Sequence, residues 1–316
     1  MNLAPLRFFD GESVAAALPW LTLIEAIENT ITDPDATAPE RTVHTIPVSN
    51  GADASVLLKP GWIVGDVFVV KVVTFFPDNG AQDLPTINAG VLLFDAATGV
   101  FRGACDGNEL TTRRTAAASA VAAKRLARSD AKRLLIVGTG ALAPMVAQAH
   151  SAVRNYDVVE VWGRNAGKAQ QVANHLVTHN LNARASQDLD ESVRAGDVIS
   201  CVTGATSPLV KGRLLKPGTH VDLIGSFTPT MRESDDDVVR GATIVADTRT
   251  DGTIAGDLAQ PLESGVIAFE DIVADLRELI VGQHPGRTNN EEITVFKSAG
   301  IALEDVAAAK LVFSRD

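Results

Sequence analysis

The chain has 316 residues, of which 46% are hydrophobic and 21% charged, a composition typical of a folded globular protein. Its formal net charge is −11, which excludes broad binding to a nucleic-acid backbone but not to a small anion that a few cations could hold. The length suits two domains. Two cysteines, Cys105 and Cys201, supply neither a disulfide framework nor a zinc site. Because Met1–Asp10 lacks signal-peptide features and no apolar run is long enough to span a bilayer, we expect a cytoplasmic protein without a membrane partner.

The first third of the chain predicts a mixed α+β domain. Apolar residues at helical spacing predict a helix over Val14–Thr30. Strand-like runs follow at Val43–Val48, Ser55–Leu58, Val67–Phe76 and Ala89–Asp95. Turn signals such as Asn50-Gly51 and Pro60-Gly61 separate these runs.

From Leu110 onward strands and helices alternate, which predicts a doubly wound parallel sheet covered by helices on both faces. The predicted helices are Thr111–Arg128, Ala141–Arg154, Ala166–His179 and Ala302–Leu311. The predicted strands are Arg133–Val137, Val158–Trp162, Val198–Val202, His220–Ile224 and Thr243–Ala246. The fold class is therefore α/β with an added α+β domain.

A glycine-rich turn joins the first predicted strand of this sheet to the following helix. It reads Gly138-Thr139-Gly140-Ala141-Leu142-Ala143, a G-x-G-x-x-A pattern. The first Gly allows the tight turn, the second lets backbone approach a pyrophosphate, and the small third residue lets helix and strand pack. The helix N-terminus would then face the phosphates. An ordinary strand-to-helix turn is the alternative, but the context predicts a Rossmann-type dinucleotide site.

The end of the next strand bears on the choice between NAD(H) and NADP(H). An acidic residue there would bind the ribose 2′-hydroxyl of NAD. The chain instead reads Trp162-Gly163-Arg164-Asn165, with Lys168 one turn further. Arg164 could stack on adenine and pair with a 2′-phosphate, and Lys168 could add charge. We therefore predict NADP(H) over NAD(H), with a solvated loop carrying two surface cations as the alternative.

Three cations of the first domain are candidates for binding an anion. Lys71 shares a strand face with apolar residues, where an ammonium is costly without a partner or cavity; the alternative is an edge-strand lysine that prevents aggregation. Arg114 falls in the first turn of its predicted helix, so this site as a whole should attract anions, whereas the adjacent Arg113 is expected to face solvent. Arg41 alone has the features of a surface arginine. The histidines show no metal-ligand spacing, so no metal is expected.

Several segments together resemble the ornithine cyclodeaminase/mu-crystallin family. The segments are Lys71-Val72-Val73-Thr74-Phe75, Leu84-Pro85-Thr86, Gly90-Val91-Leu92-Leu93-Phe94-Asp95, Asp106-Gly107-Asn108, Leu110-Thr111-Thr112-Arg113-Arg114-Thr115-Ala116-Ala117, the glycine turn, and Thr294-Val295-Phe296-Lys297-Ser298-Ala299-Gly300. The resemblance covers nearly the whole chain.

This resemblance implies a homodimer of two-domain subunits. A substrate-binding and dimerisation domain would comprise residues 1–112 with the C-terminal helix 301–316, and a Rossmann domain would comprise residues 113–300. Arg41 and Arg114 match the arginines that hold the substrate carboxylate, and Lys71 matches the active-site lysine. Thr203 and Lys297 join the glycine turn, Arg164, Asn165 and Lys168 as candidates for cofactor binding.

One segment departs from the cyclodeaminase pattern. Ornithine cyclodeaminases have G-G-D-C-P-G-K where this chain has Gly225-Ser226-Phe227-Thr228-Pro229-Thr230-Met231. Phe227 replaces the aspartate that handles the substrate amine, and a phenyl ring can neither accept a proton nor bind an ammonium. Nearby Asp222 lies within a predicted strand and is expected to be structural. The segment looks instead like that of the family's Δ1-pyrroline-2-carboxylate reductases.

The resulting hypothesis is an NAD(P)H-dependent ketimine reductase. It would convert Δ1-pyrroline-2-carboxylate to L-proline, and also Δ1-piperideine-2-carboxylate to L-pipecolate. Phe227 would form an apolar wall of the substrate pocket, and Thr86 and Asn88 are further candidates for its lining. The alternatives are an ornithine cyclodeaminase or alanine-type amino-acid dehydrogenase of the same family, and a mu-crystallin-like small-ligand binding protein.

Overall fold

The structure is a computed structural model, and it describes residues 6–49 and 51–314. The chain divides into two compact units. Unit 1 comprises residues 1–114 and 301–316, and unit 2 comprises residues 115–300. Helix α3 (Gly107–Leu126) passes from one unit into the other.

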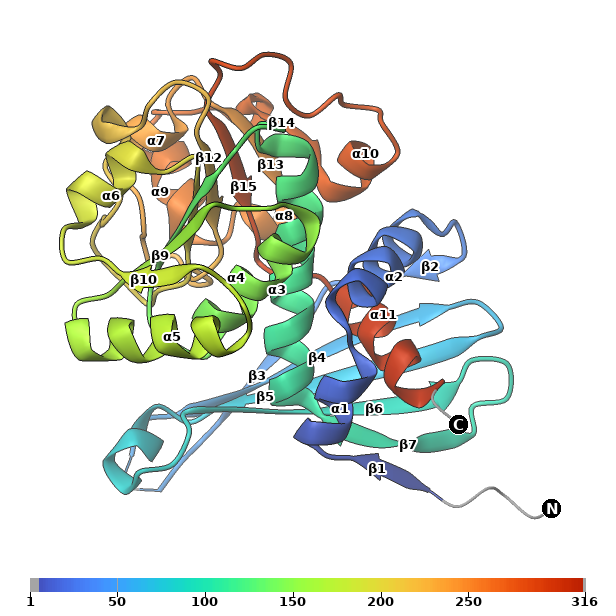
Figure 1. Ribbon diagram of the computed structural model, residues 1–316. Helices are drawn as coiled ribbons and strands as arrows, with labels where there is room; N and C mark the ends of the chain where they lie inside the picture. Colours follow the sequence, from blue (N-terminus) through green and yellow to red (C-terminus); the bar gives the residue numbers. More distant parts are fainter. Residues whose placement is uncertain (1–5, 50, 315–316) are drawn as a thin grey trace. The chain divides into compact units, whose positions relative to one another are not determined.

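Unit 1 is built on a seven-stranded sheet in the order β1-β7-β6-β5-β4-β2, with β3 also pairing with β4. The strands are β1 (Arg7–Phe9), β2 (Ala36–Thr37), β3 (Thr42–Ile46), β4 (Ala54–Ile63), β5 (Val67–Phe75), β6 (Ile87–Asp95) and β7 (Phe101–Asp106). A 3-10 helix, η1 (Pro77–Gln82), joins β5 to β6, and the helices are α1 (Gly11–Ala17), α2 (Trp20–Thr32) and α11 (Ala302–Phe313). Helix α11 packs against α2, β4 and β5 (Figure 1).

The helices and strands of unit 1 differ from the predicted ones at two prolines. The helix predicted over Val14–Thr30 is two helices, because Pro19 caps α2 and disfavours helical backbone at the residue before it. The turn predicted at Pro60-Gly61 lies inside β4. Strand β3 pairs with residues 54–58 of β4 and β2 with residues 62–63, so on this side of β4 Pro60 stands between the two pairings, a position that suits a residue without an N–H.

Gly61 explains how α11 can lie so close to β4. A Cβ at this position would meet Val306 Cγ2 at 2.9 Å and Ala302 Cβ at 3.4 Å. Only glycine therefore allows this approach without displacing the helix. The close contact brings the first two turns of α11 over the sheet residues that follow and precede Gly61.

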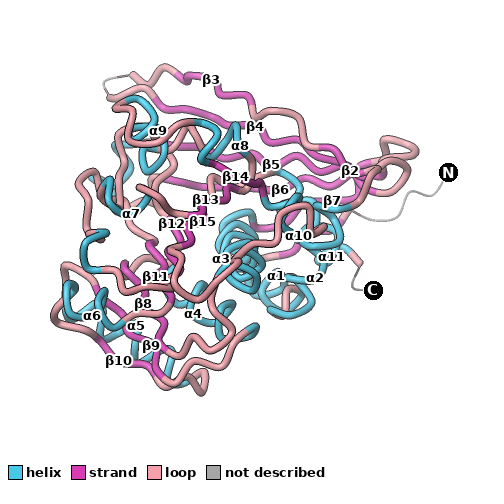
Figure 2. Tube along the Cα trace, turned by 90° about the horizontal axis from the view of Figure 1, so that it is seen from above, coloured by secondary structure: helices cyan, strands magenta, loops and turns pink. Residues whose placement is uncertain are grey.

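Unit 2 contains an eight-stranded parallel sheet in the order β10-β9-β8-β11-β12-β15-β13-β14, visible in Figure 2. Its strands are β8 (Arg133–Val137), β9 (Val158–Trp162), β10 (Ala183–Ala185), β11 (Val198–Cys201), β12 (His220–Leu223), β13 (Thr243–Ala246), β14 (Ile272–Asp275) and β15 (Thr294–Lys297). Its helices after α3 are α4 (Leu142–Val153), α5 (Ala166–Thr178), α6 (Leu189–Ala195), α7 (Asp236–Val239), α8 (Arg249–Gly252), α9 (Gly256–Glu263) and α10 (Leu276–Ile280), with the 3-10 helices η2 (Gly212–Leu214) and η3 (Phe269–Asp271). The predicted α/β class with a parallel sheet is confirmed.

The two faces of the unit 2 sheet bury different chemistry. On one face, alternate strand residues such as Leu135 and Val221 form an apolar core with Val193 of α6 and Leu258 of α9. The other face carries a buried polar cluster around Asp222, contacted from α3 and α4.

Taken one at a time, the helices of the described residues are too short or too polar to span a membrane. Helices α1 and α2, which are bent relative to each other, reach the required length and apolar composition only when they are taken as a pair.

Candidate active site and cofactor pocket

A buried cluster of charged side chains lies between the sheet of unit 1 and α11. Lys71 of β5 is 1% exposed, and its ammonium lies 2.7 Å from Asp305 Oδ1 of α11. Lys59 of β4 reaches Asp305 Oδ2 at 3.1 Å, and the hydroxyl of Thr111 accepts a hydrogen bond from Lys71 at 3.2 Å. Lys71 therefore lies on a central strand, and the edge-strand alternative is wrong.

Arg114 completes this cluster from α3. Its Nε lies 2.9 Å from Asp305 Oδ1 and its Nη1 lies 2.5 Å from Glu304 Oε2. The helix begins at Gly107 and not at Thr111, so Arg114 lies two turns inside it and not in the first turn as predicted. Arg113 does not face solvent freely either, because it pairs with Glu109 and lies over the ring of Trp20.

Burial and charge shift the proton affinities of this cluster in opposite directions. Burial, aided by the Arg114 charge, lowers the pKa of Lys71 well below its ordinary value although Asp305 opposes this. Burial acts to raise the pKa of Asp305, but the charges of Arg114 and the two lysines outweigh it and hold that pKa below its usual range. Asp305 therefore stays ionised, while Lys71 is a stronger acid than an exposed lysine.

The remaining unit 1 candidates lie at different distances from the cluster. Arg41, half-buried just before β3, is near enough that its charge helps to lower the pKa of Lys59. Thr86 lies just before β6 and its carbonyl accepts from the Phe76 N–H. The register pairs Asn88 with Thr74, which puts Asn88 on the sheet face opposite Lys71. Asn88 there lines a separate hollow of about 280 Å³.

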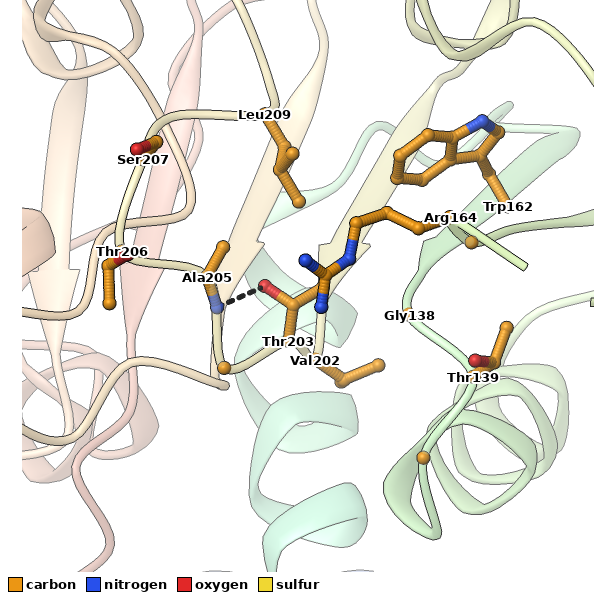
Figure 3. A pocket seen from close by; sticks show the side chains of 13 residues that line it. Gly138, Thr139, Trp162, Arg164, Val202, Thr203, Ala205, Thr206, Ser207 and Leu209 are labelled. Atoms are coloured by element: carbon orange, nitrogen blue, oxygen red, sulfur yellow. Dashed lines mark hydrogen bonds between the residues drawn. The ribbon is translucent and has the colours of Figure 1, made fainter. Parts of the chain in front are cut away.

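A pocket of about 390 Å³ opens in unit 2 at the carboxyl ends of β8, β9 and β11, shown in Figure 3. Gly138 has a φ of +135°, and a Cβ there would meet the Val202 carbonyl oxygen at 2.8 Å. Nothing lies within 4 Å of the Cβ position of Gly140, and α4 begins two residues later without a side-chain cap. An open backbone at an uncapped N-terminus of a helix fits a pyrophosphate.

The turn after β9 contributes one cation to this pocket. Arg164 lines it and in Figure 3 extends into it beside the ring of Trp162. Asn165 caps α5 by accepting a hydrogen bond from the Lys168 N–H at 3.0 Å. Asn165 and the exposed Lys168, like Ala141 and Leu142 of the glycine turn, are not among the lining residues.

The third wall of the pocket comes from the segment after β11. Thr203 lines it together with Thr139 of the glycine turn, and the buried carboxylate of Glu233 fixes Thr203. Glu233 accepts hydrogen bonds from Thr203 N at 2.6 Å and Thr203 Oγ1 at 2.8 Å, and from Gly225 N at 2.8 Å. Burial, together with the neighbouring Asp257 carboxylate, raises the pKa of Glu233 to about 7.

Two unit 2 candidates lie away from the pocket lining. Lys297 is fully buried, and its ammonium donates to the carbonyls of Leu223 at 2.9 Å and Ser226 at 2.6 Å. The structure thus gives Lys297 a role in holding the loop after β12, and it does not face the cofactor pocket. Phe227 lies in that loop and is 52% exposed.

The most consequential residues that sequence reasoning missed are Lys59, Glu304, Asp305 and Glu233. Each is a charged residue that the structure buries, with an exposed fraction of 6% or less. Lys59 and the two acidic residues of α11 occupy positions in an apolar strand and an apolar helix, which is the one signal that could have marked them. Within residues 6–49 and 51–314, no group of three or more His, Cys, Asp or Glu could hold a metal ion.

The parallel sheet, the glycine turn and the pocket beyond it define a dinucleotide-binding protein. The family model of the ornithine cyclodeaminase/mu-crystallin family matches residues 12–316. The chain belongs to this family, and the predicted resemblance is confirmed.

Three similar proteins refine this placement. A Δ1-pyrroline-2-carboxylate reductase of Paracoccus denitrificans is 34% identical over 97% of this chain and 96% of its own. A Thermococcus litoralis enzyme of the same name, solved with NADH and L-proline, has a TM-score of 0.91 and 32% identity over 97% of this chain and 96% of its own. An archaeal alanine dehydrogenase dimer with bound NAD has a TM-score of 0.90 and 28% identity over 98% and 95%.

Proposed function

We propose that the protein catalyses the NAD(P)H-dependent reduction of Δ1-pyrroline-2-carboxylate to L-proline, and of Δ1-piperideine-2-carboxylate to L-pipecolate. The C=N bond of the ring becomes a C–N single bond, with a hydride added at C2 and a proton added at nitrogen. A relative named Δ1-pyrroline-2-carboxylate reductase, 34% identical to this chain, supports the reaction on the five-membered ring. So does the neighbour solved with NADH and L-proline.

The observation that carries this proposal is the buried Lys71 ammonium held by Asp305. Reduction of a cyclic imine needs a proton at nitrogen, because the protonated imine is the better hydride acceptor. Burial lowers the pKa of Lys71 well below its ordinary value, which makes its ammonium a stronger proton donor than that of an exposed lysine. Lys71 would give this proton, and Asp305 would hold the side chain in place.

Arg114 and Arg41 would bind the substrate carboxylate. A guanidinium carries five N–H donors in a fixed plane and pairs with carboxylates in a defined orientation. Glu304 and Asp305 fix the guanidinium of Arg114 before substrate arrives. A preset arginine of this kind orients the ring and lowers the entropic cost of reaching the reactive geometry.

Gly138, Gly140, Thr139 and Thr203 would hold the dinucleotide in unit 2, since they line the pocket beside the uncapped end of α4. When bound, the reduced nicotinamide supplies the hydride. We infer a preference for NADPH from Arg164, which lies at the β9 end of the pocket, where an acidic residue would favour NAD.

Phe227 separates this function from ornithine cyclisation. A phenyl ring at the loop after β12 offers no carboxylate to bind the second amine of ornithine, whereas an apolar side chain suits the methylene groups of a cyclic imine. The exposed fraction of 52% leaves this ring available to a ligand.

The decisive assay mixes purified protein with NADPH and Δ1-pyrroline-2-carboxylate and follows the absorbance of the reduced cofactor. Turnover should depend on both the imine and the cofactor, and chiral chromatography should identify L-proline. Parallel reactions with ornithine plus NAD⁺, and with pyruvate plus ammonia plus NADH, test the cyclodeaminase and alanine dehydrogenase alternatives. Ammonia release from ornithine without imine reduction would contradict the proposal, and tight ligand binding without turnover in any arm would favour a binding protein.

We also infer a homodimer formed through unit 1. The sheet face opposite Lys71 carries a row of half-buried aromatic side chains, Trp62, Phe68, Phe94 and Phe101, with neighbouring ring centroids 5.0 to 6.3 Å apart. An apolar face of this kind is typical of an oligomer contact. Sedimentation of the wild type and of Phe68→Asp would test it, the variant being expected to shift toward monomer.

A cytoplasmic location is inferred from the chemistry of the cysteines. Both Cys105 and Cys201 are buried as free thiols, a state that a reducing compartment preserves. Fractionation of cells that produce the tagged protein would test this location.

A further inference from the structure

Lys59 is a second buried lysine in the substrate site, and the proposed reaction does not use it. It is 6% exposed on β4. The antiparallel register places Lys59 directly opposite Lys71 on β5, with both side chains on the face that α11 covers. Two like charges in such a cross-strand pair repel each other unless a counter-ion lies between them.

One carboxylate is shared by this pair. Asp305 Oδ2 lies 3.1 Å from the Lys59 ammonium, and Asp305 Oδ1 lies 2.7 Å from the Lys71 ammonium and 2.9 Å from Arg114 Nε. With Glu304 as the second acid, three cations meet two carboxylates. Lys71 therefore shares the negative charge of Asp305 with Lys59 and Arg114. When Lys71 loses its proton, the repulsion among these cations decreases.

We propose that Lys59 is a positioning residue that governs how readily Lys71 gives up its proton, by occupying the second oxygen of Asp305. The inference rests on the proposed function, in which Lys71 is the proton donor. The charge of Lys59 contributes to lowering the pKa of Lys71, behind burial and the charge of Arg114.

The other groups that face Lys71 come from every element packed around it. Around Lys71 itself these are Arg114 and the Thr111 hydroxyl from α3, Asp305 from α11, and Cys105 from β7 in the same row of the sheet. Glu304 of α11 and Arg41 from the segment before β3 act on the neighbouring Lys59. Burial raises the pKa of Cys105 to about 12, so its thiol stays neutral. Among the cations of this cluster, Lys59 can be changed without removing a residue assigned to bind or protonate substrate.

The test compares Lys59→Met with the charge-keeping Lys59→Arg and with the surface control Lys310→Met. Without the Lys59 charge, Asp305 no longer neutralises a second lysine and stabilises the Lys71 ammonium more strongly. Lys71 should therefore keep its proton to higher pH. We expect the alkaline limb of the kcat profile of Lys59→Met to move up by about one pH unit, a roughly tenfold change in proton affinity. Its kcat at neutral pH should fall roughly three- to tenfold because the acid is weaker, with KM nearly constant. Lys59→Arg and Lys310→Met should keep the wild-type limb.

A second readout does not depend on turnover. The ¹³Cε resonance of Lys71 in isotope-labelled protein, assigned by its loss in Lys71→Met, reports the titration of the ammonium directly. Lys59→Met should move this titration upward as it moves the kinetic limb. If the wild type reduces no imine, the proposed function fails, while the resonance still decides the role of Lys59.

An unmoved Lys71 titration in folded Lys59→Met would overturn the inference, as would a rise in KM with an unchanged limb, which would make Lys59 a substrate-binding residue. If Lys59→Met does not fold, Lys59→Gln removes the same charge with a polar side chain and is judged by the same criteria.

Discussion

Each unit buries a carboxylate among basic side chains, and the two clusters are built from different partners. Asp305 in unit 1 meets two lysines and an arginine. Asp222 in unit 2 meets His150 at 3.0 Å, His220 at 3.6 Å and the Ser119 hydroxyl, which donates to it. Histidine and serine can be neutral at physiological pH, whereas lysine and arginine rarely are.

From this difference we predict that the Asp222 cluster stabilises the fold and that the Asp305 cluster can bind a ligand. Burial lowers the pKa of His220, which favours its neutral form, and the side chains of the Asp222 cluster are closed to solvent, with 0% exposure. In the Asp305 cluster the ion pairs described above join three cations to two carboxylates, an arrangement to which we expect an anionic ligand to add a third negative charge. The expectation from the sequence that Asp222 is structural agrees with this arrangement, but it stays a prediction until tested.

Asp305→Asn should have the largest effect. It would leave three buried cations with one carboxylate, so we expect a loss of about 3–5 kcal/mol in the free energy of unfolding. Urea denaturation measures this loss. The matched control Asp66→Asn removes the partner of Lys310 in a pair that is nearly half exposed, and should cost less than about 1 kcal/mol. Equal losses of unfolding free energy in the two variants would mean that the buried cations do not depend on the charge of Asp305.

Asp222→Asn should cost less and spare catalysis. An amide can still accept from Ser119, but it no longer carries the charge that its histidine partners face, so we expect a loss of about 1–3 kcal/mol. The kcat of the folded fraction should stay within about threefold of the wild type. A large fall in kcat at unchanged stability would break the comparison, because it would give Asp222 a part in the chemistry.

Acid should weaken the two clusters in different pH ranges. The pKa of His220 is lowered from its ordinary 6.5 by burial, so below that pH the unfolded chain binds a proton that the folded chain refuses, and stability falls. The pKa of Asp222 and of Asp305 is also lowered, from an ordinary 3.8, so their contribution is lost only at more acid pH. His220→Gln should reduce the loss of unfolding free energy below pH 6.5 by up to about 1.4 kcal/mol per pH unit. It should leave unchanged the loss that occurs at more acid pH. A decline of unchanged slope in this variant would exclude His220 as its source.

Arg164→Ala extends the comparison to an exposed cation. Its removal should change the free energy of unfolding by less than about 0.5 kcal/mol, because the side chain is exposed. It should nevertheless lower kcat/KM for NADPH roughly tenfold and leave that for NADH nearly unchanged, because only the former carries a 2′-phosphate. Arg184→Ala, which removes another exposed arginine of unit 2, is the control. Parallel losses with both cofactors would remove Arg164 from cofactor selection.

The cofactor pocket was largely predictable because its signals are local. The glycine turn, the strand before it and the helix after it lie within about twenty residues, and β8 and β9 have the predicted bounds. The charged cluster of unit 1 could not be predicted from local signals, because Lys71 and Asp305 are 234 residues apart in the chain. Lys59 was missed for a further reason: the turn signal at Pro60-Gly61 ended the predicted strand early, whereas the close approach of α11 requires glycine within the strand.

The position of α11 along the chain has a consequence for biosynthesis. This helix supplies both acids of the unit 1 cluster but follows all of unit 2, residues 115–300, in the chain. At usual translation rates the ribosome needs roughly ten to forty seconds to traverse that stretch. During this interval Lys59, Lys71 and Arg114 exist without their counter-ions, so the nascent first segment cannot bury them. Unit 2 is therefore free to fold first, and the charged cluster of unit 1 forms only when α11 emerges and docks beside Gly61.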